Sequence, residues 1–369
     1  MGLSTDPPCE PRDQPVEAHV YRRPLLHRLN VESLVVFRAL HLGDMLCAVP
    51  ALRALRASLP RARIALVGLP WARQFAQRFA GYVDEFIAFP GHPGLPEQAP
   101  QSELIAPFYA DMCGRGFTLA LQLHGSGDIS NDIVSGFGAR AMAGFCRGAA
   151  IHTDKTVLYP YPAAGAESER LLSLVERLGG MAAGDELEFP LQPQDQDELD
   201  RSGLAAGLAQ GDYICIHPGA RKRDKCWPPE RFAQVADRLA AEFGVNVVVT
   251  GSADEADLAR AVARHMQAPA HNAAAPISIG AMAALMRGAR LLVCNDTGVS
   301  HIAAGLGLKS VVIFSKADIA RWAPLDRHNH RCIWDPDAER AAVVLQHARA
   351  LLAGTAPSRQ RITGMWPYW

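Results

Sequence analysis

The stretch SLVVFRALHLGDMLCAVPALRALRASLPRARIALVG, residues 33–68, carries the pattern that determines the architecture. It begins with a short apolar run, Ser33–Phe37, which is typical of a strand, and continues through the turn Leu42-Gly43-Asp44. Apolar residues then recur at helical spacing from Met45 to Leu59, and 62–68 again has the composition of a strand. Strand, glycine turn, helix and strand in this order are the signature of a βαβ unit.

The same pattern restarts in the second half of the chain. Tyr213–His217 is strand-like and leads into a turn at Pro218-Gly219, a helix over 229–243 and a strand over 245–250. Further strands are predicted at 85–89, 118–123, 291–294 and 310–314, and further helices at 167–178, 278–288, 298–305 and 338–352. The strands are continuous apolar runs without alternation, as expected for parallel strands that are covered on both faces.

Between the two halves, a glycine-rich and then polar stretch predicts a connector. It contains Gly179-Gly180, Gly184 and the charged segment Pro193–Asp200. The sequence therefore predicts an α/β protein with two Rossmann-like domains that face each other across a cleft, the arrangement called GT-B among glycosyltransferases. The expected divisions are a flexible N-terminal extension (1–30), an N-terminal Rossmann-like domain (31–190), a C-terminal Rossmann-like domain (191–335), and a C-terminal helix and tail (336–369).

Composition excludes several classes of protein. Of the 369 residues, 49% are hydrophobic and 20% charged, which is the balance of an ordinary globular protein. The net charge of −1 provides no overall field for nucleic acid, so no nucleic-acid partner is expected. No run approaches the ~20 apolar residues of a membrane helix. The eight cysteines form no Cys-x-x-Cys pair, which argues against zinc-ribbon and thioredoxin-like sites and favours a cytoplasmic location.

Two nucleotide-binding motifs are missing from the sequence. No Gly-x-Gly-x-x-Gly follows the first strand, and no Gly-x₄-Gly-Lys-Ser/Thr occurs anywhere in the chain. A dehydrogenase and a P-loop nucleotidase are therefore weak hypotheses. Ligands of open α/β sheets bind beyond the carboxyl ends of the strands, and the glycine turns of this sequence lie at those ends.

Asp44 occupies the first of these turns, between a strand and a helix. One interpretation is that it caps the helix. The other is that its carboxylate faces the cleft and acts as a general base toward a substrate hydroxyl. The sequence alone leaves both interpretations open.

The loop HPGARKRDKCWP, residues 217–228, carries four cations between Arg221 and Lys225. A run of charges is usually a solvated loop, but this one follows a strand and precedes a helix, which favours binding of a phosphate or diphosphate. Lys225 and the helix N-terminus beyond it could stabilise a diphosphate leaving group by electrostatics, without a metal ion.

A third cluster, Asn295-Asp-Thr-Gly-Val-Ser-His301, also follows a strand and enters a helix. Thr297 and Gly298 can offer a hydroxyl and backbone N–H groups to phosphate oxygens. Asp296 and His301 could bind sugar hydroxyls or a second phosphate, although a single histidine is more often structural. Asp335-Pro-Asp337 and Asp195-Gln-Asp197 resemble a metal-binding Asp-x-Asp, but the first is better explained as a helix start and the second as part of the connector. No metal site and no cofactor are expected.

Together these clusters resemble the bacterial ADP-heptose:lipopolysaccharide heptosyltransferases, glycosyltransferase family 9. The matching segments are Arg38-Ala-Leu-His-Leu-Gly-Asp44 with Pro50, His217-Pro-Gly-Ala220, Lys225-Cys-Trp-Pro228, Gly251-Ser-Ala-Asp-Glu255 and Asp296-Thr-Gly-Val-Ser-His301. The resemblance implies a GT-B fold with an acceptor-side N-terminal domain, a C-terminal domain that binds the nucleotide-sugar, and inverting, metal-independent transfer.

The resemblance also implies roles for individual residues. Asp44 matches the catalytic base, and Lys225 matches a lysine that serves both catalysis and the donor phosphate. The other residues assigned to the donor are Gly219, Glu255, Asp296, Thr297, Gly298 and His301, with Glu255 near the nucleoside. Arg38 and His41 are assigned to the acceptor.

The expected activity is transfer of heptose from ADP-heptose to a saccharide hydroxyl, with lipopolysaccharide inner core or a related saccharide as acceptor. The loop 221–224 departs from the family because it is more basic and lacks paired hydroxyl residues. Two alternatives therefore stay open: a GT-B transferase or 2-epimerase that uses another nucleotide-sugar, and a non-catalytic protein that binds an ADP-sugar. Peripheral contact with the inner face of the cytoplasmic membrane is also left open.

Overall fold

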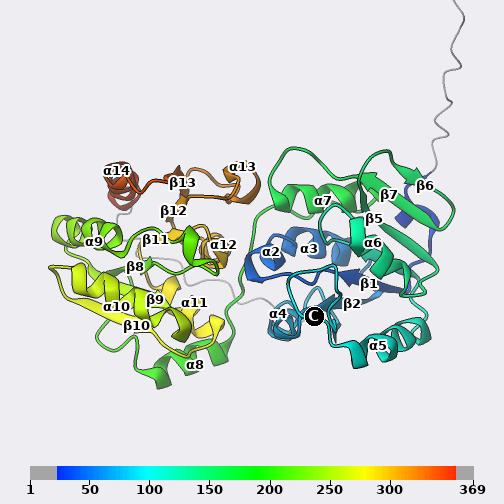
Figure 1. The fold of residues 1–369 in the computed structure, drawn as a ribbon, viewed down its shortest axis with the longest axis horizontal. Helices are drawn as coiled ribbons and strands as arrows, with labels where there is room; N and C mark the ends of the chain where they lie inside the picture. The colour runs from blue at the N-terminus through cyan, green and yellow to red at the C-terminus, as the bar shows by residue number, and fades with distance from the viewer. Residues whose placement is uncertain (1–22, 355–369) are drawn as a thin grey trace, which may run out of the picture.

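The computed structural model describes residues 23–354, which form two α/β halves lying side by side, each built on its own sheet (Figure 1). The N-terminal sheet has the strand order β3-β2-β1-β4-β5-β7-β6. Its strands are β1 (Ser33–Phe37), β2 (Arg63–Gly68), β3 (Glu85–Ala88), β4 (Leu119–Gln122), β5 (Ala141–Cys146), β6 (Ile151–His152) and β7 (Thr156–Pro160). All neighbouring strands are parallel except the short edge strand β6, which runs antiparallel to β7.

The C-terminal sheet has the order β10-β9-β8-β11-β12-β13, and all of its neighbouring pairs are parallel. Its strands are β8 (Tyr213–His217), β9 (Asn246–Gly251), β10 (Ala270–Ala274), β11 (Leu292–Asn295), β12 (Ser310–Phe314) and β13 (His330–Trp334). In both sheets the strand order reverses direction next to the first strand, at β1/β4 and at β8/β11. Such a reversal opens a crevice at the carboxyl ends of the strands, where ligands bind.

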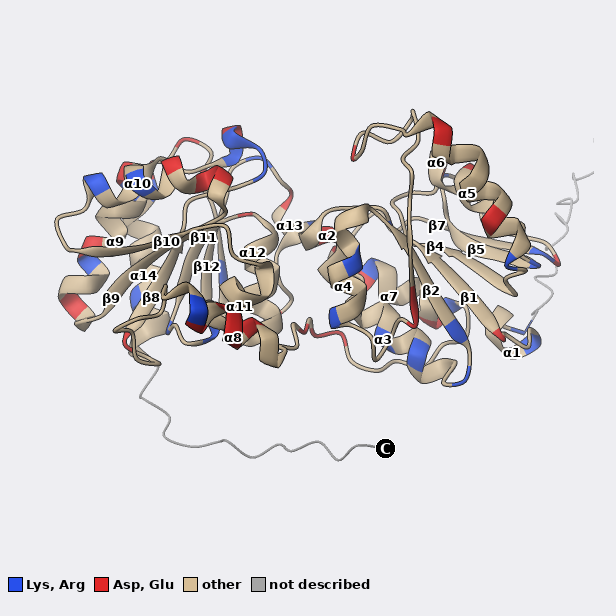
Figure 2. Cartoon of the chain, turned by 90° about the horizontal axis from the view of Figure 1, so that it is seen from below, with Lys and Arg blue, Asp and Glu red and all other residues tan. Residues whose placement is uncertain are grey.

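Helices cover both faces of each sheet, and the charged residues lie mainly on these helices and on loops (Figure 2). The N-terminal helices are α1 (Leu25–Arg28), α2 (Leu42–Leu46), α3 (Val49–Ser58), α4 (Arg73–Arg78), α5 (Ser102–Gly114), α6 (Asp128–Ser135) and α7 (Glu167–Arg177). The C-terminal helices are α8 (Pro193–Ser202), α9 (Pro229–Phe243), α10 (Ala256–His265), α11 (Ile279–Arg287), α12 (Gly298–Leu306), α13 (Ile319–Trp322) and α14 (Ala341–Ala353). All five residues of β8 are buried, which explains its unbroken apolar run.

The predicted α/β fold with two parallel sheets is confirmed, but several local predictions are wrong. The single helix predicted over 45–59 is two helices in the structure. The first, α2, begins already at Leu42 and ends at Leu46, and the second, α3, begins at Val49. The predicted connector over 193–200 is α8, which Pro193 opens and Gly203 closes in the left-handed conformation. The last helix begins at Ala341 rather than at 338, and Asp335 accepts hydrogen bonds from the N–H groups of residues 339 and 340.

The predicted flexible N-terminal extension, 1–30, wrongly includes residues that belong to the folded N-terminal half. Residues 25–28 form the helical turn α1, in which Leu25 is buried and the N–H of Leu26 donates to the carbonyl of Leu178 at 2.9 Å. Residues 1–22 of that extension and residues 355–369 of the predicted tail lie outside the described residues.

The two halves meet through α2 and α12, at a pair of glycines. A Cβ atom on Gly298 would lie 3.2 Å from the backbone N of Gly43, so neither helix could approach the other this closely with a side chain at that point. The contact joins the turn after β1 to the turn after β11, and it therefore brings the predicted functional clusters of the two halves together.

Candidate active site

A cavity of about 600 Å³ lies between the two halves at the carboxyl ends of their strands. The N-terminal half contributes the segment His41–Asp44, which follows β1, and Trp71, which follows β2. The C-terminal half contributes residues from the ends of β8 and β9, from the segments that follow β8, β9, β10 and β11, and from α11, α12 and α13: His217, Ala220, Arg221, Lys222, Lys225, Gly251, Ser252, Glu255, Ile277, Ser278, Ile279, Met282, Asp296, Thr297, Gly298, Val299, His301 and Trp322.

Asp44 lies in the first turn of α2 and lines this cavity. The N-cap of α2 is His41, so the structure does not support the interpretation of Asp44 as the helix cap. Within residues 23–354, no hydrogen bond or ion pair occupies its carboxylate, whereas its backbone carbonyl accepts a hydrogen bond of 2.9 Å from Nε of Arg38. The turn is thus held by its backbone while the side chain stays available to a ligand.

Lys225 ends a short 3₁₀ turn, and its Nζ lies 2.9 Å from Oδ2 of Asp296. This ion pair links two of the predicted clusters, the loop after β8 and the loop after β11. Asn295 strengthens the link, since its Oδ1 accepts from the N–H of Trp227 at 2.9 Å and its Nδ2 donates to the carbonyl of Pro218 at 2.8 Å. The two loops therefore form one rigid wall of the cavity.

The remaining cations of the loop 221–225 divide into two groups. Arg223 turns away from the cavity and donates to Oδ1 of Asp257 at 2.9 Å. Arg221 and Lys222 are exposed and line the cavity, and their side chains have no hydrogen-bond or ion-pair partner within the described part of the chain. These two positive charges are therefore available to a negatively charged ligand in the cavity.

Glu255 lines the same cavity from the turn after β9. Its Oε2 accepts hydrogen bonds from the N–H and the hydroxyl of Ser252, at 2.9 and 3.0 Å. Gly219 does not line the cavity, but a Cβ at that position would lie 2.1 Å from Oε1 of Glu255, so glycine is required for the carboxylate to sit there. Gly219 was predicted to contact the donor. In the structure it instead leaves the space in which the carboxylate of Glu255 lies.

His217 connects this carboxylate to the sheet. Its Nε2 is 3.8 Å from Oε2 of Glu255, and its Nδ1 is 3.1 Å from the hydroxyl of Thr250. Burial lowers the pKa of His217, and the neighbouring Glu255 opposes that shift only in part. A neutral imidazole beside a carboxylate leaves the negative charge of Glu255 available to hydroxyl donors.

The N-terminus of α12 is the clearest anion site in the cavity. Thr297 is the N-cap residue, its side chain makes no cap hydrogen bond, and both it and Gly298 line the cavity. The first N–H groups of a helix have no partner inside the helix and attract negative charge. Lys225 borders the same cavity, so a cation and a helix N-terminus are both available to one diphosphate.

His301 proves to be both a cavity residue and an interdomain contact. Its buried ring packs against Gly43, and Nδ1 lies 3.8 Å from Sγ of Cys47. Burial lowers the pKa of His301, while the carboxylates of Asp296 and Asp44 oppose the shift. The imidazole is therefore a neutral group that bridges the two halves at the edge of the cavity.

The two residues assigned to the acceptor have different positions. His41 lines the cavity, and its Nε2 is buried without a hydrogen-bond partner in the described structure. Burial and the nearby Arg221 lower the pKa of His41, and Asp44 opposes this. Arg38 is fully buried, and it donates to the carbonyls of Asp44 and Leu123. Direct contact between Arg38 and an acceptor is thus contradicted, because its guanidinium lies beneath the turn rather than in the cavity.

Two aromatic residues that line the cavity, Trp71 and Trp322, were not predicted from the sequence. Trp71 lies in a 3₁₀ turn directly after β2, so the rule that ligands bind at strand ends could have indicated it. Trp322 belongs to the four-residue helix α13 and carries no local signal of a site.

Within residues 23–354, no group of three or more His, Cys, Asp or Glu side chains is arranged to hold a metal ion. None of the helices in this range is long and apolar enough to cross a bilayer.

The family model described as "Glycosyltransferase family 9 (heptosyltransferase)" matches residues 112–348. The chain belongs to glycosyltransferase family 9. This family 9 chain is 31% identical over 159 residues to lipopolysaccharide heptosyltransferase 3 of Escherichia coli, an alignment that covers 42% of the chain and 46% of the relative. It is 33% identical over 132 residues to lipopolysaccharide heptosyltransferase 1 of Pseudomonas aeruginosa, covering 35% of the chain and 36% of the relative. The chain thus spans less than half the length of these curated relatives.

Solved structures share the fold over nearly their whole length. A family 9 glycosyl transferase from Veillonella parvula superposes with a TM-score of 0.73 at 19% identity, covering 89% of this chain and 99% of that one. The E. coli ADP-heptose lipopolysaccharide heptosyltransferase II superposes with a TM-score of 0.68 at 20% identity, covering 87% and 98%. The two-domain GT-B architecture of this family 9 chain is therefore shared with solved members.

Proposed function

We propose that this chain transfers heptose from ADP-heptose to a hydroxyl of a lipopolysaccharide core saccharide, with inversion at the anomeric carbon. The observation that carries the proposal is the composition of one cavity. A carboxylate from one half, Asp44, and an anion site from the other half, Lys225 with Thr297-Gly298, line the same 600 Å³ space. A transferase that activates a hydroxyl and stabilises a diphosphate leaving group needs both groups in one site.

The C-terminal half suits a nucleotide-sugar. The apolar side chains of Ile277, Ile279 and Met282 offer a surface for the nucleobase, and Glu255 can accept hydrogen bonds from ribose hydroxyls. Lys225 donates one hydrogen bond to Asp296 and has two further N–H donors for phosphate oxygens. The curated relatives are named as lipopolysaccharide heptosyltransferases, which supports heptose as the transferred sugar. The similar E. coli structure is named as an ADP-heptose heptosyltransferase, which supports ADP-heptose as the donor.

The transfer step assigns one role to each half. As the acceptor oxygen attacks the anomeric carbon, its proton passes to the carboxylate of Asp44. The bond from that carbon to the diphosphate breaks, and the electron pair leaves with ADP, whose new charge is stabilised by Lys225 and the N-terminus of α12. Attack opposite to the departing ADP inverts the carbon. His41 lines the cavity close to Asp44, so its ring can pack against the acceptor sugar.

The experiment is a donor and acceptor assay with the purified protein. ADP-heptose and a panel of core saccharides should give both ADP release and a product larger by one heptose. Calorimetry with ADP and UDP should show tighter binding of ADP. Turnover of a UDP-sugar instead would favour the alternative transferase or epimerase. Binding of ADP-heptose without turnover on any acceptor would favour the non-catalytic alternative.

A further inference from the structure

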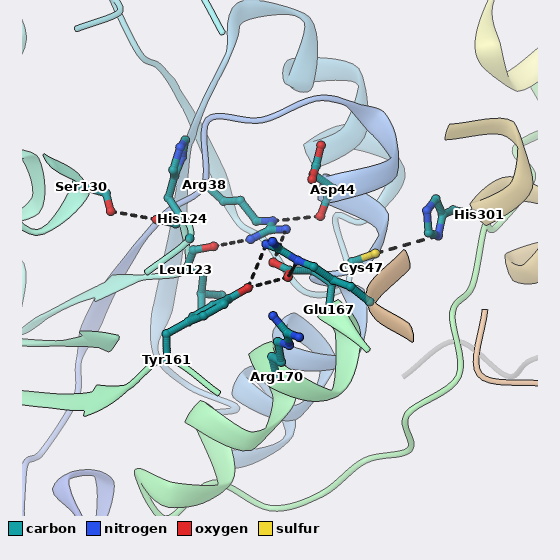
Figure 3. A network of polar contacts seen from close by, with 12 residues as sticks. Arg38, Asp44, Cys47, Leu123, His124, Ser130, Tyr161, Glu167, Arg170 and His301 are labelled. Carbon is teal, nitrogen blue, oxygen red and sulfur yellow. Dashed lines mark hydrogen bonds and ion pairs between the residues drawn. The ribbon is translucent and has the colours of Figure 1, made fainter. Parts of the chain in front are cut away.

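A buried cluster of charges joins the two halves beneath the turn that carries Asp44 (Figure 3). At its centre is Glu167, the first residue of α7, which is 1% exposed. Its Oε2 accepts from Nε of Arg321 at 2.9 Å and from the hydroxyl of Tyr161 at 2.6 Å, and its Oε1 lies 3.4 Å from Nη2 of Arg38. Nη2 of Arg321 also donates to the Tyr161 hydroxyl at 3.0 Å. One carboxylate thus holds two guanidinium groups.

One of these guanidinium groups, that of Arg38, is hydrogen-bonded to the backbone of the proposed base, Asp44. Arg38 is fully buried, and its Nε donates to the backbone carbonyl of Asp44 at 2.9 Å. Another of its nitrogens, Nη1, donates to the carbonyl of Leu123, at the carboxyl end of β4. The contacts of Arg38 therefore fix the turn that carries Asp44 relative to the sheet below it, and Glu167 fixes Arg38 from the other side.

The other guanidinium group comes from the opposite half of the molecule. Arg321 lies on α13, whereas Glu167, Tyr161 and Arg38 all belong to the N-terminal half. Its guanidinium carbon is 4.6 Å from the ring centre of its neighbour Trp322, which lines the cavity. The ion pair between Arg321 and Glu167 therefore joins the two halves directly.

The buried charge of Glu167 makes its ion pair with Arg321 important for the stability of the cluster. Burial alone would raise the pKa of Glu167, but Arg38 and Arg321 together with the Tyr161 hydroxyl outweigh burial and lower it. A buried ionised carboxylate that loses one partner must be compensated by those that remain. Without Arg321, the carboxylate keeps only Arg38 and the Tyr161 hydroxyl as partners, so its hold on Arg38, which also binds the carbonyl of Asp44, must change.

We propose that Arg321 is a positioning residue of the C-terminal half that supports the placement of Asp44 in the N-terminal half, acting through Glu167 and Arg38. The inference rests on the proposed function, because it presupposes that Asp44 is the base. It means that the donor half itself completes the support of the base in the acceptor half.

The test compares Arg321→Ala, Arg321→Lys, Glu167→Gln and the double variant Arg321→Ala/Glu167→Gln. Tyr161→Phe removes only the hydroxyl, and it keeps the test possible if Glu167→Gln does not fold. The matched control is Arg327→Ala, an exposed arginine of the same segment that donates to the backbone of Ile319 in α13 but does not touch Glu167. The readouts are kcat, KM for the donor and acceptor, and the Kd of ADP by calorimetry.

We expect Arg321→Ala to lower kcat at least tenfold while the Kd of ADP stays within twofold, and Arg321→Lys to recover part of the loss. The double variant should be no slower than the worse single variant, because both act through one route. The control should keep wild-type kcat. Multiplying losses in the double variant, or an equal loss in the control, would overturn the positioning role. A wild-type protein without any transfer activity would instead overturn the proposed function and this inference with it.

Discussion

Replacement of Gly43 by alanine tests whether the close contact between the two halves places the catalytic groups. The added Cβ would lie 2.9 Å from Cδ2 of His301 and 3.3 Å from Cα of Gly298. Carbon atoms normally approach to about 3.5–4.0 Å, so α2 and α12 would have to separate by roughly 0.5–1 Å. His301 is buried, which leaves its ring little room to turn aside. Overpacking of this kind costs about 1–3 kcal/mol.

The expected consequence is a selective loss of turnover. A displacement of about 1 Å between reacting groups can lower a rate about 10²-fold, and we expect a fall of that order in kcat. The Kd of ADP should stay within twofold, because the proposed nucleotide contacts all belong to the C-terminal half. The assay is steady-state ADP release with donor and acceptor, combined with calorimetry on ADP.

The matched control for this substitution is Gly114→Ala, at the end of α5, where an added Cβ meets no atom within 4 Å. It should keep wild-type kcat. A Gly43→Ala protein with wild-type kcat would refute the reasoning, since the two halves would then tolerate separation. A loss of ADP affinity as large as the loss of kcat would refute the division of roles between the halves.

Three further predictions concern single side chains. Asp44→Asn should lower kcat by about 10²–10⁴-fold and leave the Kd of ADP unchanged; a larger effect on ADP binding than on turnover would remove Asp44 from the role of base. Lys225→Ala should weaken ADP binding by about 1.5–3 kcal/mol in calorimetry, with partial recovery in Lys225→Arg, and unchanged affinity would contradict the diphosphate site. Burial and then Arg38 lower the pKa of His124 from its ordinary 6.5 to about 3, so the folded state resists protonation and the free energy of unfolding should fall as pH drops below 6.5. His124→Asn should reduce that slope by roughly 1 kcal/mol per pH unit in urea unfolding at pH 7, 6 and 5, and an unchanged slope would show that His124 does not remain neutral.

Strand-based features of this molecule could be predicted from the sequence because their signals are local. Five consecutive residues of β8 are buried, so the strand is visible as an apolar run. The turns after such strands must lie at the edge of the sheet, which is why Asp44, Lys225 and the 295–301 segment could be placed in one cleft. Segments whose order comes from tertiary contacts were missed. Helix α8 is polar, and its Asp195 is held by an ion pair of 2.6 Å to Arg78 in the other half.

The buried residues that hold the turn of Asp44 in place could not be predicted, because their order also comes from tertiary contacts. Glu167 is separated from Arg38 by 129 residues and from Arg321 by 154, and no pattern in the sequence pairs them. The resemblance assigns Arg38 to the acceptor, whereas the structure buries Arg38 beneath the turn that carries Asp44. Proximity in sequence indicated the region of the site, but only the packing of the two halves distinguishes a cavity residue from its support.

A crystal structure of this chain soaked with ADP-heptose, or with an analogue that cannot be transferred, would show whether the two halves form one transferase site. We predict a diphosphate with oxygens hydrogen-bonded to Nζ of Lys225 and to the N–H groups at Thr297-Gly298, and an anomeric carbon that faces the carboxylate of Asp44. A diphosphate bound away from the N-terminus of α12, or a sugar that points away from Asp44, would contradict the account.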